Sequence, residues 1–386
     1  MTVTVRSFAK INLGLCVGAL RADGFHDLRT VYQTIALHDL LQVEVGRGTG
    51  IEIRCDDPRV PKDHTNTCYR IVELAMAALR ARGRVTITID KQLPVQGGLG
   101  AGSGNAVATL LALERALKKK LPGAERLRLA AEVGSDSPLF LVGGTVLGVG
   151  HGEEVYPLPE SPPVCCVVAT PEIGVSTPKA FADWDAIVSA PPGRANNREG
   201  GERKGDDRGR DDGQRHDREG HDFSRASNAS QDVAALAAEG TAEGGRPHVD
   251  LAKLTAHSPS DRMNGFGCAV SAWLSGQPLS GVPVSKGRGR AETSLLDLVR
   301  TGIENDFEQV VFPKYPELRE VKGVLERAGA VYASLSGSGS AIYGLFASRT
   351  AGQKAAARLQ RQGVPAVATT TMTREQYWQK FLVSGF

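Results

Sequence analysis

The sequence predicts an α+β fold with two lobes, and two observations carry that prediction. Segments with the alternating apolar pattern of strands crowd the part of the chain between residues 2 and 89. Helix and strand patterns then follow in mixed order, which is typical of α+β proteins and not of a doubly wound parallel sheet. At 386 residues the chain can bury one large core or two ordinary ones.

The elements follow from apolar periodicity, with period 2 for strands and 3.6 for helices. Strands are predicted at 2–5, 11–17, 31–37, 41–45, 51–55, 85–89, 145–149, 331–334, 341–346 and 366–371. Helices are predicted at 68–82, 106–117, 126–133, 295–303, 316–328 and 351–362.

The domain prediction places an N-terminal lobe at 1–158 and a C-terminal lobe at 159–386. A low-complexity insertion interrupts the second lobe at about 189–248, since 191–222 holds no aromatic residue and is rich in glycine and in charges of both signs. Such a composition cannot bury enough apolar surface to offset chain entropy. We expect a disordered, solvated spacer, with a binding tail as the less favoured alternative.

Composition excludes several classes of protein. A net charge of +3 and a pI near 8.5 do not suggest a nucleic-acid or membrane partner. No apolar run approaches the ~20 residues that span a bilayer, and the N-terminus lacks a signal-peptide pattern. The six cysteines show no zinc spacing. We expect a cytoplasmic protein with reduced, buried thiols and no metal centre of its own; the sequence does not indicate its oligomeric state.

A glycine-rich loop is the most informative segment. Five glycines lie between Gln96 and Asn105, with a predicted strand directly before them and a predicted helix directly after. Glycine lets the backbone approach a ligand closely, and the unpaired N–H groups at a helix start attract anions. The segment therefore predicts a cradle for phosphate, most simply that of a nucleotide.

The residues of this loop and its flanks disfavour three alternatives. A flexible linker is disfavoured because linkers are seldom placed between a clean strand and a clean helix. The chain has no Gly-Lys dipeptide, so the loop is no P-loop. The dinucleotide fingerprint fails because Ser103 occupies the position of its third glycine.

Three further segments hold candidate chemistry. Lys10 and Asn12 share one face of a strand and could bind an oxyanion or hydroxyl, although such a pair is often an exposed edge. Asp136 lies between a helix end and an apolar run, as a helix cap or as a base near the cradle. The loop at 335–340, Leu-Ser-Gly-Ser-Gly-Ser, is either a tight turn or the opposite wall of a phosphate site.

Together these blocks resemble the galactokinase, homoserine kinase, mevalonate kinase and phosphomevalonate kinase (GHMP) superfamily. The ATP loop of that superfamily matches Pro94–Gly100, and further matching blocks are 9–13, 21–26, 90–94, 134–136, 305–308 and 336–339. The resemblance covers about 1–185 and 295–350 and leaves out the insertion.

The resemblance implies an N-terminal lobe like ribosomal protein S5 domain 2, a ferredoxin-like C-terminal lobe and ATP-dependent phosphorylation of a small alcohol. Its catalytic lysine and aspartate fall on Lys10 and Asp136. The aspartate would accept the hydroxyl proton, while the lysine would orient the hydroxyl and stabilise negative charge. ATP would be the phosphoryl donor, with Mg²⁺ carried by the nucleotide, and the lobe at 1–158 would be the ATP-binding and catalytic lobe.

The binding residues implied by the resemblance form two sets. Those for ATP are Asn66, Lys91, Pro94, Val95, Gln96, Gly97, Gly98, Leu99, Gly100, Ala101, Gly102, Ser103 and Gly104. Those for an acceptor that carries a cytidine diphosphate group are Asn12, Phe25, His26, Thr177, Phe181, Gly337 and Ser338.

The chain departs from the superfamily pattern at several positions. Phe25 replaces a usual tyrosine, Gln96 and Ala101 replace glycines, and Gly104 replaces a serine. Stacking survives the change at Phe25, whereas the change at Gly104 removes one possible hydroxyl contact to phosphate or Mg²⁺.

Two alternative functions remain at this point. The first is another kinase of the superfamily, of the homoserine or mevalonate type. Phe25 and His26 argue against it, because those substrates have no base to stack on an aromatic ring. The second is a non-enzyme that binds nucleotide on the same fold. The presence of both Lys10 and Asp136 argues against that function. Taken alone, His26 would be an ordinary surface or core histidine.

Overall fold

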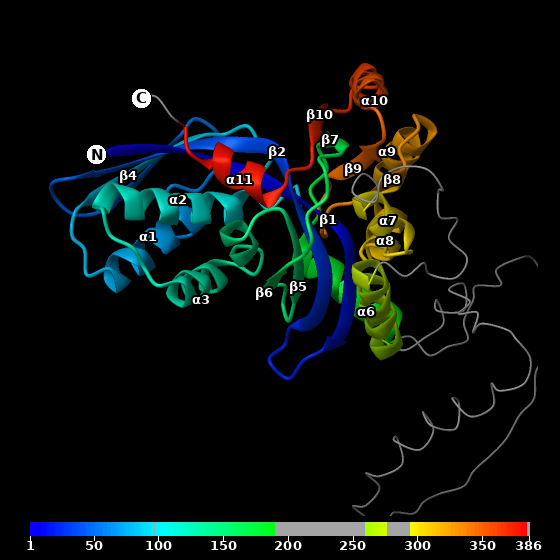
Figure 1. Cartoon of the computed structure of the whole chain (residues 1–386), viewed down its shortest axis with the longest axis horizontal. Helices are drawn as coiled ribbons and strands as arrows, with labels where there is room; N and C mark the ends of the chain where they lie inside the picture. Colours follow the sequence, from blue (N-terminus) through cyan, green and yellow to red (C-terminus); the bar gives the residue numbers. More distant parts are fainter. Residues whose placement is uncertain (96, 190–258, 276–293, 384–386) are drawn as a thin grey trace, which may run out of the picture. The chain divides into compact units, whose positions relative to one another are not determined.

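A computed structural model describes residues 1–95, 97–189, 259–275 and 294–383. The predicted α+β class is confirmed: helices pack against two antiparallel or mixed sheets (Figure 1). The first sheet has the order β3-β4-β2-β5-β6, with β1 paired to β2. Its strands are β1 (Thr2–Leu20), β2 (His26–Gly46), β3 (Ile51–Cys55), β4 (Arg84–Asp90), β5 (Thr145–Val149) and β6 (Glu154–Pro157).

The hairpin of β1 and β2 differs from the prediction, because two long strands replace the four short ones predicted at 2–5, 11–17, 31–37 and 41–45. Register shifts interrupt the pairing, for example between Phe8 and Ala9. A bulge inserts an unpaired residue and changes the face on which the following side chains lie. The apolar alternation therefore breaks within a continuous strand, and the sequence pattern alone suggests a strand end.

Helices α1 (Thr67–Ala78), α2 (Ala101–Leu117) and α3 (Gly123–Val133) accompany the first sheet (Figure 1). The central one, α2, contacts β1, β2 and α1 and is buried along most of its length. It begins five residues before the predicted start at 106, directly after Gly100 in the left-handed region at φ 70°. Small residues at 101–104 form its first turn, so the predicted glycine loop is shorter than its composition suggests.

The second sheet has the order β10-β7-β9-β8 and is antiparallel throughout. Its strands are β7 (Cys165–Ala169), β8 (Tyr332–Leu335), β9 (Ile342–Phe346) and β10 (Ala366–Thr370). The helices of this part of the chain are α4 (Thr177–Val188), α6 (Pro259–Ser275), α7 (Ser294–Arg300), α8 (Glu308–Lys314), α9 (Pro316–Arg327) and α10 (Arg349–Arg361). Of these, α6 contacts β1 and β2 of the first sheet. The sequence prediction missed β6, β7, α4, α6, α8 and the C-terminal α11 (Arg374–Phe381).

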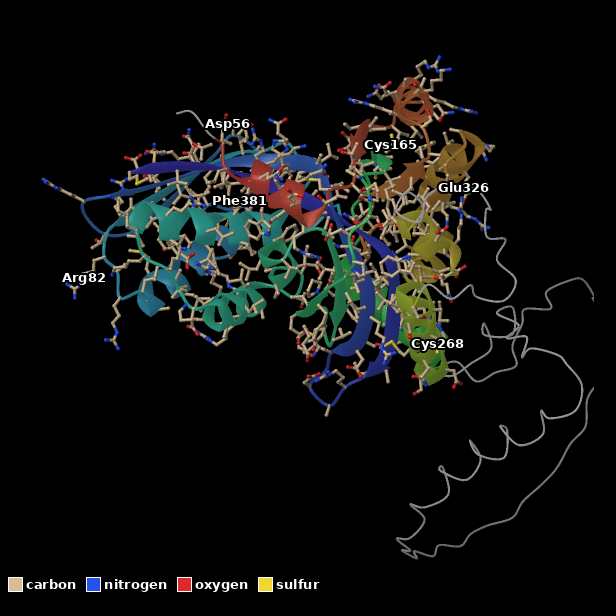
Figure 2. All side chains as sticks on the ribbon, viewed as in Figure 1. Asp56, Arg82, Cys165, Cys268, Glu326 and Phe381 are labelled. Atoms are coloured by element: carbon tan, nitrogen blue, oxygen red, sulfur yellow. The ribbon has the colours of Figure 1, made fainter. Side chains whose placement is uncertain are left out.

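The C-terminal helix returns to the first sheet. Phe381 belongs to the apolar core around β2 and β4, whereas Cys165 belongs to the core of the second sheet (Figure 2). The hydroxyl of Tyr377 donates to the carbonyl oxygen of Phe140 at 2.8 Å, which ties α11 to the end of the helical segment after Asp136. The predicted division at 158 and 159 stays a prediction.

Three further expectations meet the structure here. The predicted insertion falls almost entirely on 190–258, outside the described residues. All six cysteines are free thiols; five are buried as expected and Cys268 is exposed. Within the described ranges, none of the helices has the length and apolar character needed to cross a bilayer.

Candidate active site

The glycine turn before α2 is held from two sides. On one side, the backbone N–H of Lys10 donates to the carbonyl oxygen of Leu99 at 2.9 Å. On the other side, the Ser336 hydroxyl donates to the carbonyl oxygen of Gly98 at 2.9 Å. Gly98 takes φ 78°, in the left-handed region that glycine favours. The two glycine-rich segments, distant in sequence, are therefore in direct contact, as expected for opposite walls of one site.

A cavity of about 350 Å³ opens at the start of α2. The first turn of this helix contains no acidic residue, so its free N–H groups and its dipole favour an anion there. Most of the residues assigned to ATP from the sequence line this cavity: Asn66, Lys91, Pro94, Val95, Gly97, Gly98, Leu99, Gly100, Ala101, Gly102 and Ser103. Gln96 lies outside the described residues.

Gly104 is placed away from the cavity. Its N–H donates to the carbonyl oxygen of Gly100 at 2.8 Å, and a Cβ there would meet the Ser7 hydroxyl at 2.9 Å and the Phe8 carbonyl oxygen at 3.0 Å. A serine at this position would crowd β1, which accounts for glycine in this chain. The structure thus does not bring Gly104 to the predicted phosphate contacts.

Asp39 is a residue that the sequence reasoning missed. Its fully buried carboxylate accepts from the backbone N–H groups of Gln92 and Leu93, and from the side chains of Lys91 and Asn105, at 2.7–3.0 Å. Four donors satisfy the buried charge. Asp39 thereby joins the segment before the glycine turn to α2 and fixes the Lys91 side chain at the cavity wall.

Lys10 and Asp136 form the charged centre of the site. The Lys10 ammonium lies 3.1 Å from Oδ2 of Asp136, and it donates to Oδ1 of Asn12 at 2.6 Å. The lysine side chain is 3% exposed and the aspartate 32%, so the pair is open only on the carboxylate side. Asn12 in turn donates to the Thr30 hydroxyl at 2.8 Å. Lys10 and Asn12 are therefore buried and have polar partners, unlike residues of an exposed strand edge.

Tyr32 completes this centre and was also missed by the sequence reasoning. Its hydroxyl donates to Oδ1 of Asp136 at 2.9 Å, and the Lys10 ammonium lies 5.5 Å from the centre of its ring. Burial, reinforced by the neighbouring Asp136 carboxylate, raises the pKa of Tyr32 well above its ordinary value, so the hydroxyl remains a donor. The β1–β2 register pairs Tyr32 with Asn12 and so places it at this centre, and no sequence signal singled it out.

We expect Tyr32→Phe to lower kcat by about tenfold, because one hydrogen bond to a charged group is lost and the barrier rises by ~1–2 kcal/mol. The KM for ATP should stay within about twofold, since Tyr32 does not line the cavity at the start of α2. Steady-state kinetics of this variant beside Tyr156→Phe, an exposed tyrosine, would test this. Equal kcat values for wild type and Tyr32→Phe would show that the Tyr32 hydroxyl plays no part in turnover.

A second prediction concerns the glycine turn. Gly98→Ala should lower the free energy of unfolding by about 1–3 kcal/mol, because alanine at positive φ is strained and its Cβ would overlap the Ser336 carbonyl oxygen. Urea unfolding would measure the loss. Gly123→Ala, where a Cβ meets nothing within 4 Å, is the control and should be neutral or slightly stabilising. Equal stability of both variants would contradict the close approach of the two loops.

At the far end of the hairpin, aromatic and histidine rings pair. The exposed ring of Phe25 lies 4.8 Å from that of His151. His26 is buried, stacks on Phe181 with centroids 5.1 Å apart, and contacts Oδ1 of Asp185 through Nε2 at 2.7 Å. Phe25, His26 and Phe181 were expected together, whereas His151 and Asp185 were not; no sequence signal singled them out.

The loop of 336–340 connects the two ends of the site. The Ser338 and Thr177 hydroxyls lie 2.7 Å apart, which joins this loop to the start of α4. Asn305 donates to the carbonyl oxygens of Leu335 and Gly337, both at 2.8 Å. A Cβ at Gly337 would stand 3.5 Å from the Lys10 ammonium, so the loop passes close to the charged centre. The structure thus joins His26 to Phe181 and Thr177 to Ser338, whereas the ring of Phe25 contacts His151.

Metal-ligating side chains do not gather in the part of the chain that the structure describes: no group of three or more His, Cys, Asp or Glu residues is placed to hold an ion there.

Comparisons with known proteins agree with this geometry. The family model for the GHMP kinases N terminal domain matches residues 66–144, and that for the GHMP kinases C terminal domain matches 291–365. These two matches, with the glycine turn and the Lys10–Asp136 pair, define a GHMP kinase, an ATP-dependent small-molecule phosphotransferase.

The similar proteins narrow the class. A 4-diphosphocytidyl-2-C-methyl-D-erythritol kinase of Solibacter usitatus is 31% identical over 90% of this chain and 82% of its own length. One of Acaryochloris marina is 29% identical over 92% and 91%. A crystal structure of 4-(cytidine 5'-diphospho)-2C-methyl-D-erythritol kinase, 25% identical, superposes with a TM-score of 0.58 over 95% of this chain and 98% of that one. The chain belongs to the 4-diphosphocytidyl-2-C-methyl-D-erythritol kinase family.

Proposed function

We propose that the protein transfers the γ-phosphoryl group of ATP to the 2-hydroxyl group of 4-diphosphocytidyl-2-C-methyl-D-erythritol, in the non-mevalonate route to isoprenoid precursors. Relatives similar over most of the chain carry the name of this kinase. The observation that carries the proposal is the ion pair of Lys10 and Asp136. The buried Lys10 ammonium lies between the two glycine-rich loops, 3.1 Å from the partly exposed Asp136 carboxylate.

The chemistry assigns a role to each member of this centre. The acceptor oxygen attacks the γ-phosphorus, a new O–P bond forms, the bond to the bridging oxygen breaks and ADP leaves. Asp136 accepts the hydroxyl proton on Oδ2, while Tyr32 holds Oδ1. Lys10, positioned by Asn12, orients the hydroxyl and stabilises the negative charge of the transferring group.

The nucleotide would occupy the cavity at the start of α2. The N–H groups of Ala101, Gly102 and Ser103 belong to the helix start and suit the phosphates. Asn66 and Lys91 line the same cavity, and we expect the adenine beside them. Mg²⁺ would enter with the nucleotide as part of the substrate.

The acceptor would lie along the hairpin of β1 and β2. Phe25 is exposed and free to stack on a cytosine ring, and His26 offers a hydrogen-bonding ring beside it. Phe181 and Thr177 of α4 face the same region, through His26 and Ser338 respectively. Gly337 and Ser338 would form the wall between the base and the reacting hydroxyl.

A coupled assay of ADP release with a panel of acceptors tests the proposal. The cytidine-bearing acceptor should be used, while homoserine and mevalonate should give no turnover above background. Preferred use of either of these would assign another reaction of the superfamily. ATP binding without turnover of any acceptor would indicate a nucleotide-binding protein that is not an enzyme.

A further inference from the structure

The histidine at the start of β2 is held by two residues of one helix. His26 stacks on Phe181 with ring planes 15° apart, and its Nε2 lies 2.7 Å from Oδ1 of Asp185. Phe181 and Asp185 are four residues apart in α4, so they share one face of that helix. The His26 side chain is 6% exposed, whereas that of Asp185 is 45% exposed. Helix α4 thus fixes the His26 imidazole in two ways: Phe181 sets the plane of the ring, and Asp185 holds its Nε2 atom.

This contact determines which nitrogen carries the proton. An ionised carboxylate has only acceptor sites, so Nε2 must donate and must bear the hydrogen. In the neutral ring the lone pair then resides on Nδ1, which becomes an acceptor. Among the described residues, none forms a hydrogen bond with Nδ1 of His26. The neutral ring therefore keeps one unpaired acceptor, Nδ1, and the Asp185 carboxylate determines which nitrogen that is.

We propose that Asp185 sets the base preference of the acceptor site by fixing His26 as a hydrogen-bond acceptor at Nδ1. Cytosine carries an amino group at C4, a donor that matches this lone pair. Uracil carries a carbonyl oxygen at the same position, and two acceptors facing each other leave a buried polar atom unpaired. The inference rests on the proposed function, in which Phe25 and His26 receive the base. Asp185 is a positioning residue, because it acts through His26.

The experiment compares the cytidine diphosphate acceptor with its uridine analogue at pH 8. Wild type should prefer cytidine by at least about 10²-fold in kcat/KM, since sites that pair with a polar substrate group discriminate strongly against a mismatch. In Asp185→Asn the new amide can donate as well as accept, so both tautomers of His26 become accessible. The preference should fall at least about tenfold, mainly through KM.

Two further measurements separate this role from simple support of the fold. Asp183→Asn, on the same helix but paired with Lys314, is the matched control and should keep the wild-type preference. The ¹⁵N chemical shifts of His26 should show a proton on Nε2 in wild type and a mixture of tautomers in Asp185→Asn.

The possible outcomes are distinct. Equal use of both pyrimidines by wild type, or an unchanged preference in Asp185→Asn, would overturn the inference while leaving the kinase activity in place. A proton on Nδ1 in the wild-type spectrum would overturn it as well. Failure of wild type to phosphorylate either pyrimidine acceptor would overturn the proposed function, and this inference with it.

Discussion

Asp136→Asn should lower turnover by about 10²-fold or more, because it removes the proposed general base with almost no change in shape. The amide oxygen can still accept from Tyr32 or Lys10, but it cannot take the hydroxyl proton. ATP binding should persist, since Asp136 does not line the cavity proposed for the nucleotide. Single-turnover kinetics together with ATP titration would measure the two effects separately.

Glu125→Gln provides a control for this experiment. Glu125 is a carboxylate on α3 that pairs with Arg128 in solvent, and its amide variant should keep wild-type turnover. A near wild-type rate for Asp136→Asn would exclude Asp136 as the base, whatever the effect of the control.

The second large effect concerns the acceptor. 2-C-methyl-D-erythritol 4-phosphate, which lacks the base, should be used with a kcat/KM at least about 10²-fold lower than the full acceptor. Base stacking on an aromatic ring is worth ~1–3 kcal/mol, and hydrogen bonds to the base edge add to it. Binding energy from the remote base also positions the reacting hydroxyl, so kcat should fall as well as affinity.

Phe25→Ala tests the same point from the side of the protein. Because Phe25 is exposed and contacts only His151 among the described aromatic rings, its loss should leave the fold intact. Use of the full acceptor should drop, while the KM for ATP should change little. Comparable use of both acceptors by wild type would reject the cytidine assignment.

Local chemistry made much of this site predictable. The glycine turn is recognisable because only glycine accepts the left-handed backbone at positions 98 and 100 and the close approach of Ser336. Strong helix formers predicted α2, and the regular alternation of apolar and polar residues predicted β3 and β4. The GHMP resemblance then placed Lys10 and Asp136 in one centre, and the structure brings them within 3.1 Å.

Several elements escaped the sequence because their signals are not local. Helix α8 contains Pro313, and α4 has few buried residues, so neither shows a full apolar stripe. The bulges in β1 and β2 reset the alternation that would have marked them as single strands. In each case packing against the rest of the molecule overrides a weak local preference.

The sequence by itself determined the fold class, the glycine turn and the identity of Lys10 and Asp136, the two residues of the charged centre. Only the tertiary structure decided which groups hold the side chains of the site in place. Tyr32 hydrogen-bonds to Asp136, Asp39 to Lys91 and Asp185 to His26. The physical reason is that a motif reflects the backbone conformation and chemistry of neighbouring residues. The partner of a polar side chain is chosen by pairing between strands and helices that lie far apart in the chain, and a single sequence carries no signal of that pairing.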